Sequence, residues 1–148
     1  MKDLGQLEWF LGIKFSFHDN YIEMNQTKYL TRVLEKCRMS DCNPKSVPCD
    51  LGNNKSNQVD SKELDEPRLF REIVGSLIYA MTCTRPDLCF VVTKLSQKLA
   101  KPTMHDLNLA KFVLKYVKGT INYSLRFAKT CNPLKLEGFC DSDWGGSD

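Results

Sequence analysis

The sequence lacks a long apolar run and any recognisable targeting segment. No uninterrupted apolar stretch approaches the roughly 20 residues that a membrane helix needs. The N-terminal segment MKDLGQLEW has no hydrophobic core of the kind that a signal peptide requires. These absences predict a soluble, intracellular protein without a membrane partner, cytoplasmic in the first instance and with a nuclear location left open.

Paired metal-binding cysteines are lacking as well. The seven cysteines are odd in number, and only two histidines accompany them. Cys37 and Cys42 have four residues between them, and Cys83 and Cys89 have five, which fits no class of structural zinc site. Because most of the cysteines sit in apolar runs, we expect reduced thiols in a reducing compartment, with neither a disulfide framework nor zinc.

The motifs of common enzyme sites are also missing. Neither His18 nor His105 lies in a recognisable nucleophile–base arrangement. The glycines of GSLIYAMT and WGGSD lack the strand–loop–helix pattern, with its lysine, of a phosphate-binding loop. A net charge of +3 is too mild to identify a partner by itself, so the positions of the charges must decide.

What is present predicts an α+β protein. Residues 7–24 read as a β-hairpin, in which LEWFLGIKFSF and YIEMNQ flank a polar turn at 18–20. In the first arm Leu11, Ile13, Phe15 and Phe17 form the predicted core face. Gly12 would lie in mid-strand, where a glycine indicates close approach by another backbone or a ligand.

Helical patterns fill most of the remaining chain. Apolar residues recur at helical spacing over 27–39, and three further helices are predicted at 67–82, from Pro86 through Leu99, and at 103–118. Between them, residues 40–66 are polar, lack apolar periodicity and predict a long mobile linker. Gly75 predicts a close helix contact and Gly119 a helix stop. Two short strands, YSLRFA and LKLEGFC, follow.

Two rows of lysines are candidate nucleic-acid contacts. Lys94, Lys98 and Lys101 are spaced i, i+4, i+7, and Lys111, Lys115 and Lys118 repeat this spacing. Each row is therefore predicted to lie along one side of its helix, where it could follow phosphates. A solvated helix face explains the same pattern, and the residues alone favour that simpler interpretation.

Two carboxylates near the end of the sequence are the candidate metal ligands. Asp141 and Asp143 share one face of an extended strand in GFCDSDWGGSD, and carboxylate oxygens suit Mg²⁺. A solvated turn that ends a strand is the alternative, since Asp, Ser and Gly are common turn residues.

In order along the chain, several segments resemble the Pol polyprotein of copia-type (Pseudoviridae) retrotransposons. They are DLGQLEWFLGIKF, MNQTKYLTRVLEKCRM, FREIVGSLIYAMTCTRPDLCFVVTKLS, LKYVKGTINYSLRF and GFCDSDWGGSD. The resemblance implies the C-terminal part of a reverse transcriptase that runs into the start of ribonuclease H. Residues 1–39 would be the end of the palm with the primer-grip hairpin and first helix, 40–66 a flexible linker, 67–120 the thumb and connection helices, and 121–148 the first strands of an incomplete ribonuclease H-like domain.

The resemblance also implies roles for individual residues. Leu11 and Gly12 would lie against the primer backbone, and the lysine rows would face the template–primer duplex, an RNA–DNA or DNA helix. Asp141 matches the first metal-binding carboxylate of ribonuclease H, and Asp143 a second acidic position that is not assigned to the metal. The palm aspartates and the later ribonuclease H carboxylates have no counterpart here. Mg²⁺ is therefore expected only in the full polyprotein, and the chain alone is expected to bind no cofactor.

The resulting prediction is a fragment that contacts the template–primer duplex beside the remainder of the polyprotein, and that is inactive as a polymerase or nuclease alone. One alternative is a domesticated or relic helical module that binds proteins and has no nucleic-acid role. Another is a truncated gene product that never forms a stable protein, because apolar faces of the hairpin would stay exposed.

Overall fold

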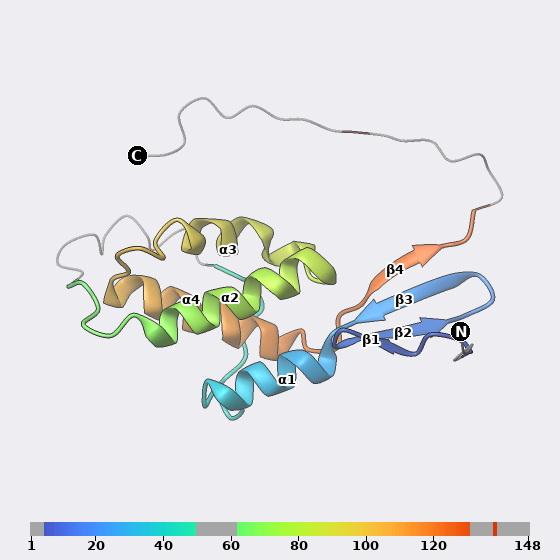
Figure 1. Cartoon of the computed structure of the whole chain (residues 1–148), viewed down its shortest axis with the longest axis horizontal. Coiled ribbons are helices and arrows are strands. Elements are labelled where there is room, and N and C mark those ends of the chain that lie inside the picture. Colours follow the sequence, from blue (N-terminus) through green and yellow to red (C-terminus); the bar gives the residue numbers. More distant parts are fainter. Residues whose placement is uncertain (1–4, 50–61, 131–137, 139–148) are drawn as a thin grey trace.

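The computed structural model describes residues 5–49, 62–130 and 138, and it has the predicted α+β composition. In these residues the elements follow the order β1, β2, β3, α1, α2, a 3₁₀ turn, α3, α4 and β4. Figure 1 shows two parts, a cluster of helices and an antiparallel sheet that extends from one end of it. Within the described part of the chain, no helix is long and apolar enough to cross a membrane.

The sheet contains four antiparallel strands in the order β1-β2-β3-β4. Their bounds are Trp9–Phe10, Ile13–Phe17, Tyr21–Asn25 and Leu125–Ala128. The prediction of one continuous first arm is wrong, because the chain reverses between β1 and β2 and pairs Phe10 with Ile13. The predicted turn at 18–20 is confirmed: the His18 amide donates to the Tyr21 carbonyl over 2.9 Å.

Strand β4 belongs to the hairpin sheet. It pairs with β3 in the register Ile22 opposite Phe127 and Met24 opposite Leu125. The resemblance in the sequence implies instead that residues 121–148 begin a ribonuclease H-like domain. The second strand of that group, LKLEGFC, lies outside the described residues except for Gly138.

The sheet has one apolar and one polar face. Cross-strand pairing aligns Phe17, Ile22 and Phe127 in one row, and all three side chains are exposed. On the opposite face Arg126 donates to the Glu23 carboxylate over 2.7 Å. The predicted core face is right only in part, since Ile13 is buried but Leu11 is 71% exposed at the turn.

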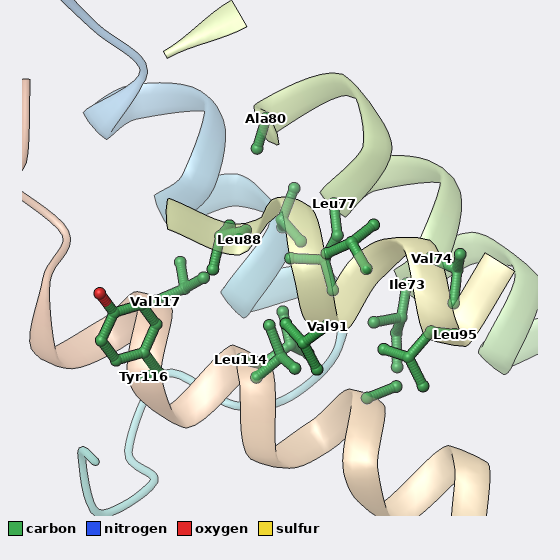
Figure 2. Close-up of a cluster of buried hydrophobic side chains, with 14 of the residues drawn as sticks. Ile73, Val74, Leu77, Ala80, Leu88, Val91, Leu95, Leu114, Tyr116 and Val117 are labelled. Carbon is green, nitrogen blue, oxygen red and sulfur yellow. The ribbon is translucent and has the colours of Figure 1, made fainter. Parts of the chain in front are cut away.

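All four α-helices in the described part of the chain contribute to one hydrophobic core. Their bounds are Thr27–Lys36 for α1, Arg68–Cys83 for α2, Cys89–Ser96 for α3 and Met104–Gly119 for α4, and the 3₁₀ turn Pro86–Leu88 precedes α3. Figure 2 shows side chains from α2, α3 and α4 converging. The buried apolar residues in this core include Leu30, Val33, Leu34, Phe70, Ile73, Val74, Leu77, Leu88, Val91, Val92, Leu95, Ala110, Val113, Leu114 and Val117. Because α1 shares this core, the polar segment 40–66 does not separate two cores.

Of the two glycine predictions one is confirmed, because α4 ends at Gly119. The other is wrong: a Cβ on Gly75 would meet no described atom within 4 Å, so there is no close helix contact at this position. A Cβ on Gly119 would lie 2.9 Å from the Lys45 carbonyl oxygen, so this glycine admits the backbone of residues 44–45 across the end of α4. The Lys45 amide also donates to the Lys115 carbonyl over 3.2 Å. This part of the predicted linker is therefore packed on α4.

A buried arginine joins the segments that lead into the sheet. Arg85 follows α2 and is only 1% exposed. Its Nε and Nη2 donate to the two carboxylate oxygens of Asp87 over 3.0 and 2.8 Å. Its Nη1 and Nη2 donate to the carbonyl and hydroxyl oxygens of Thr120, just beyond α4, over 3.2 and 2.6 Å. One guanidinium thus fixes the end of α4 against the α2–α3 connection.

Aromatic and amide groups complete this arrangement. The Tyr116 hydroxyl donates to Asp87 over 2.9 Å, and the Tyr116 and Tyr123 rings lie 5.6 and 5.4 Å from the guanidinium carbon of Arg85. We call Arg85, Asp87, Tyr116 and Thr120 the Arg85 cluster. Beside it, the Thr84 hydroxyl donates over 2.8 Å to buried Gln26, which precedes α1. The adjacent residues Thr84 and Arg85 therefore bind both Gln26, at the start of α1, and Thr120, which precedes β4.

Replacing Arg85 by Ala is expected to destabilise the fold strongly. The change removes the guanidinium donors of the Asp87 carboxylate and of the Thr120 carbonyl, and breaking a buried ion pair costs roughly 3–5 kcal/mol. We expect a value near the lower end, about 3 kcal/mol, because the Asp87 side chain is 33% exposed. Urea denaturation of the 148-residue chain measures it. Arg126→Ala, which removes an exposed pair, is the control, and an equal loss in both variants would contradict the proposed importance of Arg85.

Stability should also depend on the ionisation of Asp87. Burial by itself would raise the pKa of this carboxyl, but the hydrogen bonds and charge of Arg85 and the Tyr116 hydroxyl lower it below its usual value. The contribution is therefore complete above the unfolded pKa of about 4 and is lost as the pH falls towards the folded pKa. Urea denaturation across this acid range should show a steeper loss for the native chain than for Asp87→Asn. Parallel curves would contradict this account.

Candidate nucleic-acid interface

The β1–β2 turn is an exposed turn of the sheet that contacts helix α2. Leu11 and Gly12 form its two central positions, with φ angles of 49° and 80°. Positive φ at both positions is the mark of a type I′ hairpin turn. A Cβ on Gly12 would meet only the Tyr29 Cβ, at 3.9 Å, which is ordinary contact. Gly12 is thus required by its backbone conformation, and the predicted close approach of another backbone is not found.

Leu11 is held in an unfavourable conformation by α2. A bulky residue such as leucine is an outlier at positive φ, and such residues persist only where the surroundings impose this conformation. Here the Tyr79 hydroxyl donates to the Leu11 carbonyl oxygen. The Tyr79 ring meets the Tyr29 ring edge-on at 5.0 Å, and the Tyr29 hydroxyl donates to the Ser76 carbonyl over 3.2 Å. Two tyrosines therefore anchor the turn to the helical core.

Both phenols are suited to this donor role. Burial is the largest effect that raises the pKa of Tyr29 and that of Tyr79. Since the ordinary pKa is already about 10, the two hydroxyls keep their protons at neutral pH. The hydrogen bond to the turn is therefore present under physiological conditions.

A small cleft lies between the turn and α1. Trp9, Gly12, Lys28, Tyr29 and Arg32 line it, and its volume is about 260 Å³. The Lys28 ammonium lies 4.3 Å from the centroid of the Trp9 ring, within cation–π distance. We call this feature the turn cleft. The sequence indicates only part of the cleft, through the i, i+4 spacing of Lys28 and Arg32 on the outward side of α1.

The two cations of the turn cleft are not neutralised. Lys28 and Arg32 are exposed, and no carboxylate in the described ranges lies within ion-pair distance of either. Lys36, further along the same helix, differs because its ammonium lies 3.2 Å from the Glu72 carboxylate. Excess positive charge on α1 is thus concentrated beside the turn.

The first lysine row does not lie on one helix. Lys94 is exposed on α3, over the Phe90 ring at 4.7 Å. Helix α3 ends at Ser96, so Lys98 and Lys101 follow it in the connection to α4. The Lys101 ammonium lies 3.8 Å from Glu63. The prediction of a stripe along one helix is therefore wrong for this row, and the role of its members in binding stays a prediction.

The second lysine row does lie on one helix, but it is partly covered. Lys111, Lys115 and Lys118 are all half-buried on α4. The Lys118 ammonium donates to the Cys42 carbonyl over 2.8 Å. The part of segment 40–66 that packs on α4 thus covers the C-terminal end of the second lysine row. Lys111 and Lys115 remain the better candidates for a contact with a partner.

The predicted metal ligands cannot be placed. Asp141 and Asp143 lie outside the described residues. Within residues 5–49 and 62–130, no group of three or more His, Cys, Asp or Glu side chains could hold a metal ion. The expectation of Mg²⁺ in the full polyprotein therefore stays a prediction.

Comparisons with known proteins agree with the resemblance in the sequence. Residues 1–50 match the family described as reverse transcriptase (RNA-dependent DNA polymerase). An uncharacterized mitochondrial protein of Arabidopsis thaliana is 43% identical over 99% of this chain, which spans 59% of that protein. The retrovirus-related Pol polyprotein from transposon RE1 of A. thaliana is 34% identical over 99% of this chain, and the one from transposon TNT 1-94 of Nicotiana tabacum is 33% identical over the same share. The chain spans only 10% and 11% of these two polyproteins. No solved structure matches it.

Replacing Leu11 by Asn is expected to stabilise the chain. Asparagine tolerates positive φ, and Asn-Gly is the preferred pair for a type I′ turn. Relief of the left-handed strain should raise the free energy of unfolding by about 1 kcal/mol, as measured by urea denaturation. Gly12→Ala introduces a Cβ at positive φ and should lower stability by a similar amount. A destabilising Leu11→Asn would show that the backbone is not strained at this turn.

Proposed function

Because the chain belongs to the copia-type retrotransposon Pol family and corresponds to part of its reverse transcriptase, we propose that it contacts the template–primer duplex during RNA-directed DNA synthesis. The observation that carries this proposal is the exposed β1–β2 turn. Leu11 is bulky, solvent-exposed and strained, which is unfavourable for folding and typical of a functional position.

Charge around the turn supports the same proposal. Lys28 and Arg32, which have no carboxylate partner among the described residues, place positive charge beside the exposed turn residues Leu11 and Gly12. Nucleic-acid affinity comes mainly from contacts of this kind with phosphates. Exposed Lys94 and Lys98, and half-buried Lys111 and Lys115, are proposed as further contacts along the duplex.

The remainder of the Pol polyprotein is the second proposed partner. The whole polyprotein would carry the polymerase and ribonuclease H activities, with Mg²⁺ held by carboxylates, and Asp141 is proposed as the first ligand of the nuclease metal. This chain would supply contacts to the duplex and would not catalyse either reaction alone. We propose that it acts in the cytoplasm, where its thiols remain reduced.

One observation favours the alternative of a protein-interaction module. Phe17, Ile22 and Phe127 form an exposed apolar row across three strands, and such surfaces are often covered by another protein. This row and the turn cleft involve different residues, so the two proposals can be tested separately.

A salt series tests the proposed function. We expect the chain to bind a labelled RNA–DNA hybrid in a filter-binding assay, with an affinity that falls linearly on logarithmic axes as salt rises. Changing Lys94, Lys98, Lys111 and Lys115 together to Glu should weaken binding and flatten the salt dependence. Lys36→Glu is the matched control, because Glu72 already offsets that charge. Absence of binding, or an affinity that neither salt nor the four changes alter, would favour the protein-interaction module.

A further inference from the structure

The turn cleft combines the features of a site for one phosphate of a nucleic-acid strand. We propose that Lys28 and Arg32 together bind a backbone phosphodiester of the strand that passes the β1–β2 turn, and that Trp9 is a positioning residue for Lys28. This inference rests on the proposed function and adds to it an anion site built from α1 and β1. No residue of the two lysine rows takes part.

The charge arrangement is the first argument. Lys28 and Arg32 are one helical turn apart, and like charges at this spacing destabilise a helix. No carboxylate in the described part of the chain offsets them, whereas Glu72 offsets Lys36 on the same helix. A bound anion between Lys28 and Arg32 would remove this repulsion.

The position of Trp9 is the second argument. Trp9 ends up beside α1 because β1 folds back on β2 and pairs Trp9 with Lys14. Its ring lies under the Lys28 ammonium, with 4.3 Å between the nitrogen and the ring centroid. A cation–π contact of this kind orders a flexible lysine side chain. The ammonium is therefore held at the edge of the cleft before any ligand arrives.

The donor chemistry of Arg32 complements that of Lys28. A guanidinium presents a planar fork of N–H donors that matches two phosphate oxygens, while an ammonium acts as a compact point charge. With both side chains lining one cleft, one phosphate can be held by a fork on one side and a point charge on the other.

The size and lining of the cleft indicate a chain rather than a free small molecule. Its volume of about 260 Å³ is below the range of roughly 300–1,000 Å³ that is usual for small-molecule sites. Trp9 and Tyr29 give it an apolar wall against which a sugar can lie, and Gly12 presents no side chain at its rim. This arrangement suits one sugar–phosphate unit of a longer strand.

The proposal predicts a specific change in salt dependence. Binding of a fluorescently labelled RNA–DNA hybrid to the full 148-residue chain is measured over a salt series for Lys28→Gln, Arg32→Gln and Lys36→Gln. Each of the first two variants should reduce the slope of log affinity against log salt by roughly one, since each removes one phosphate contact. Lys36→Gln should leave the slope unchanged. Thermal unfolding curves verify that each variant is folded.

A second pair of variants tests the positioning role of Trp9. Trp9→Ala removes the ring without changing the charge, so it should weaken binding of the hybrid. Trp9→Phe keeps an aromatic face for Lys28 and should recover most of the affinity. Equal affinity in native, Trp9→Ala and Trp9→Phe chains would overturn this role.

The outcomes distinguish this inference from the proposed function. If Lys28→Gln and Arg32→Gln keep the native slope while the four-lysine variant still weakens binding, the phosphate site is wrong and the duplex-binding function stands. If no variant and no salt concentration alters binding, the duplex-binding function itself is wrong. Inorganic phosphate at constant ionic strength should not displace the hybrid, and displacement that Lys28→Gln abolishes would instead assign the cleft to free anions.

Discussion

The buried Arg85 guanidinium is the constraint on which the arrangement of the molecule depends. It fixes Asp87 in the 3₁₀ turn between α2 and α3 to Thr120 at the end of α4, while Thr84 next to it holds Gln26 at the start of α1. Gln26 directly follows β3, and Thr120 precedes β4. A buried ion pair is weak evidence for net stability, but its directional donors specify one geometry, and here that geometry orients the whole sheet.

The β1–β2 turn is also held in one conformation by contacts with the helical core. The burial of large apolar side chains in the helical core stabilises the fold enough to offset the strain at Leu11. Tyr29 and Tyr79 connect the turn to this core and hold Leu11 in place. The turn therefore presents an exposed backbone and a bulky side chain in a fixed orientation, close to the positive charges of Lys28 and Arg32. A flexible loop could not present the same surface without losing conformational entropy on binding.

The sequence predicts those features that depend on local periodicity. Helical spacing predicted the helices at 67–82 and 103–118, which correspond to α2 and α4, because an apolar face at that spacing can be buried along one side of a helix. The break between β1 and β2 was missed, because Leu11 has no turn propensity and is placed by a distant hydrogen bond from Tyr79. The pairing of β4 with β3 and the turn cleft were missed for a similar reason: each needs segments that are far apart in sequence or folded back on each other. The prediction that the first lysine row lies along one helix was wrong, because α3 ends at Ser96, before Lys98 and Lys101.

Amide hydrogen exchange with and without an RNA–DNA hybrid tests directly whether the β1–β2 turn contacts the duplex. Added hybrid should slow exchange at the β1–β2 turn and in the first two turns of α1, where Lys28 and Arg32 lie. Protection that is confined to β4 and the apolar sheet face, or no change in any segment while the hybrid is bound, would contradict it.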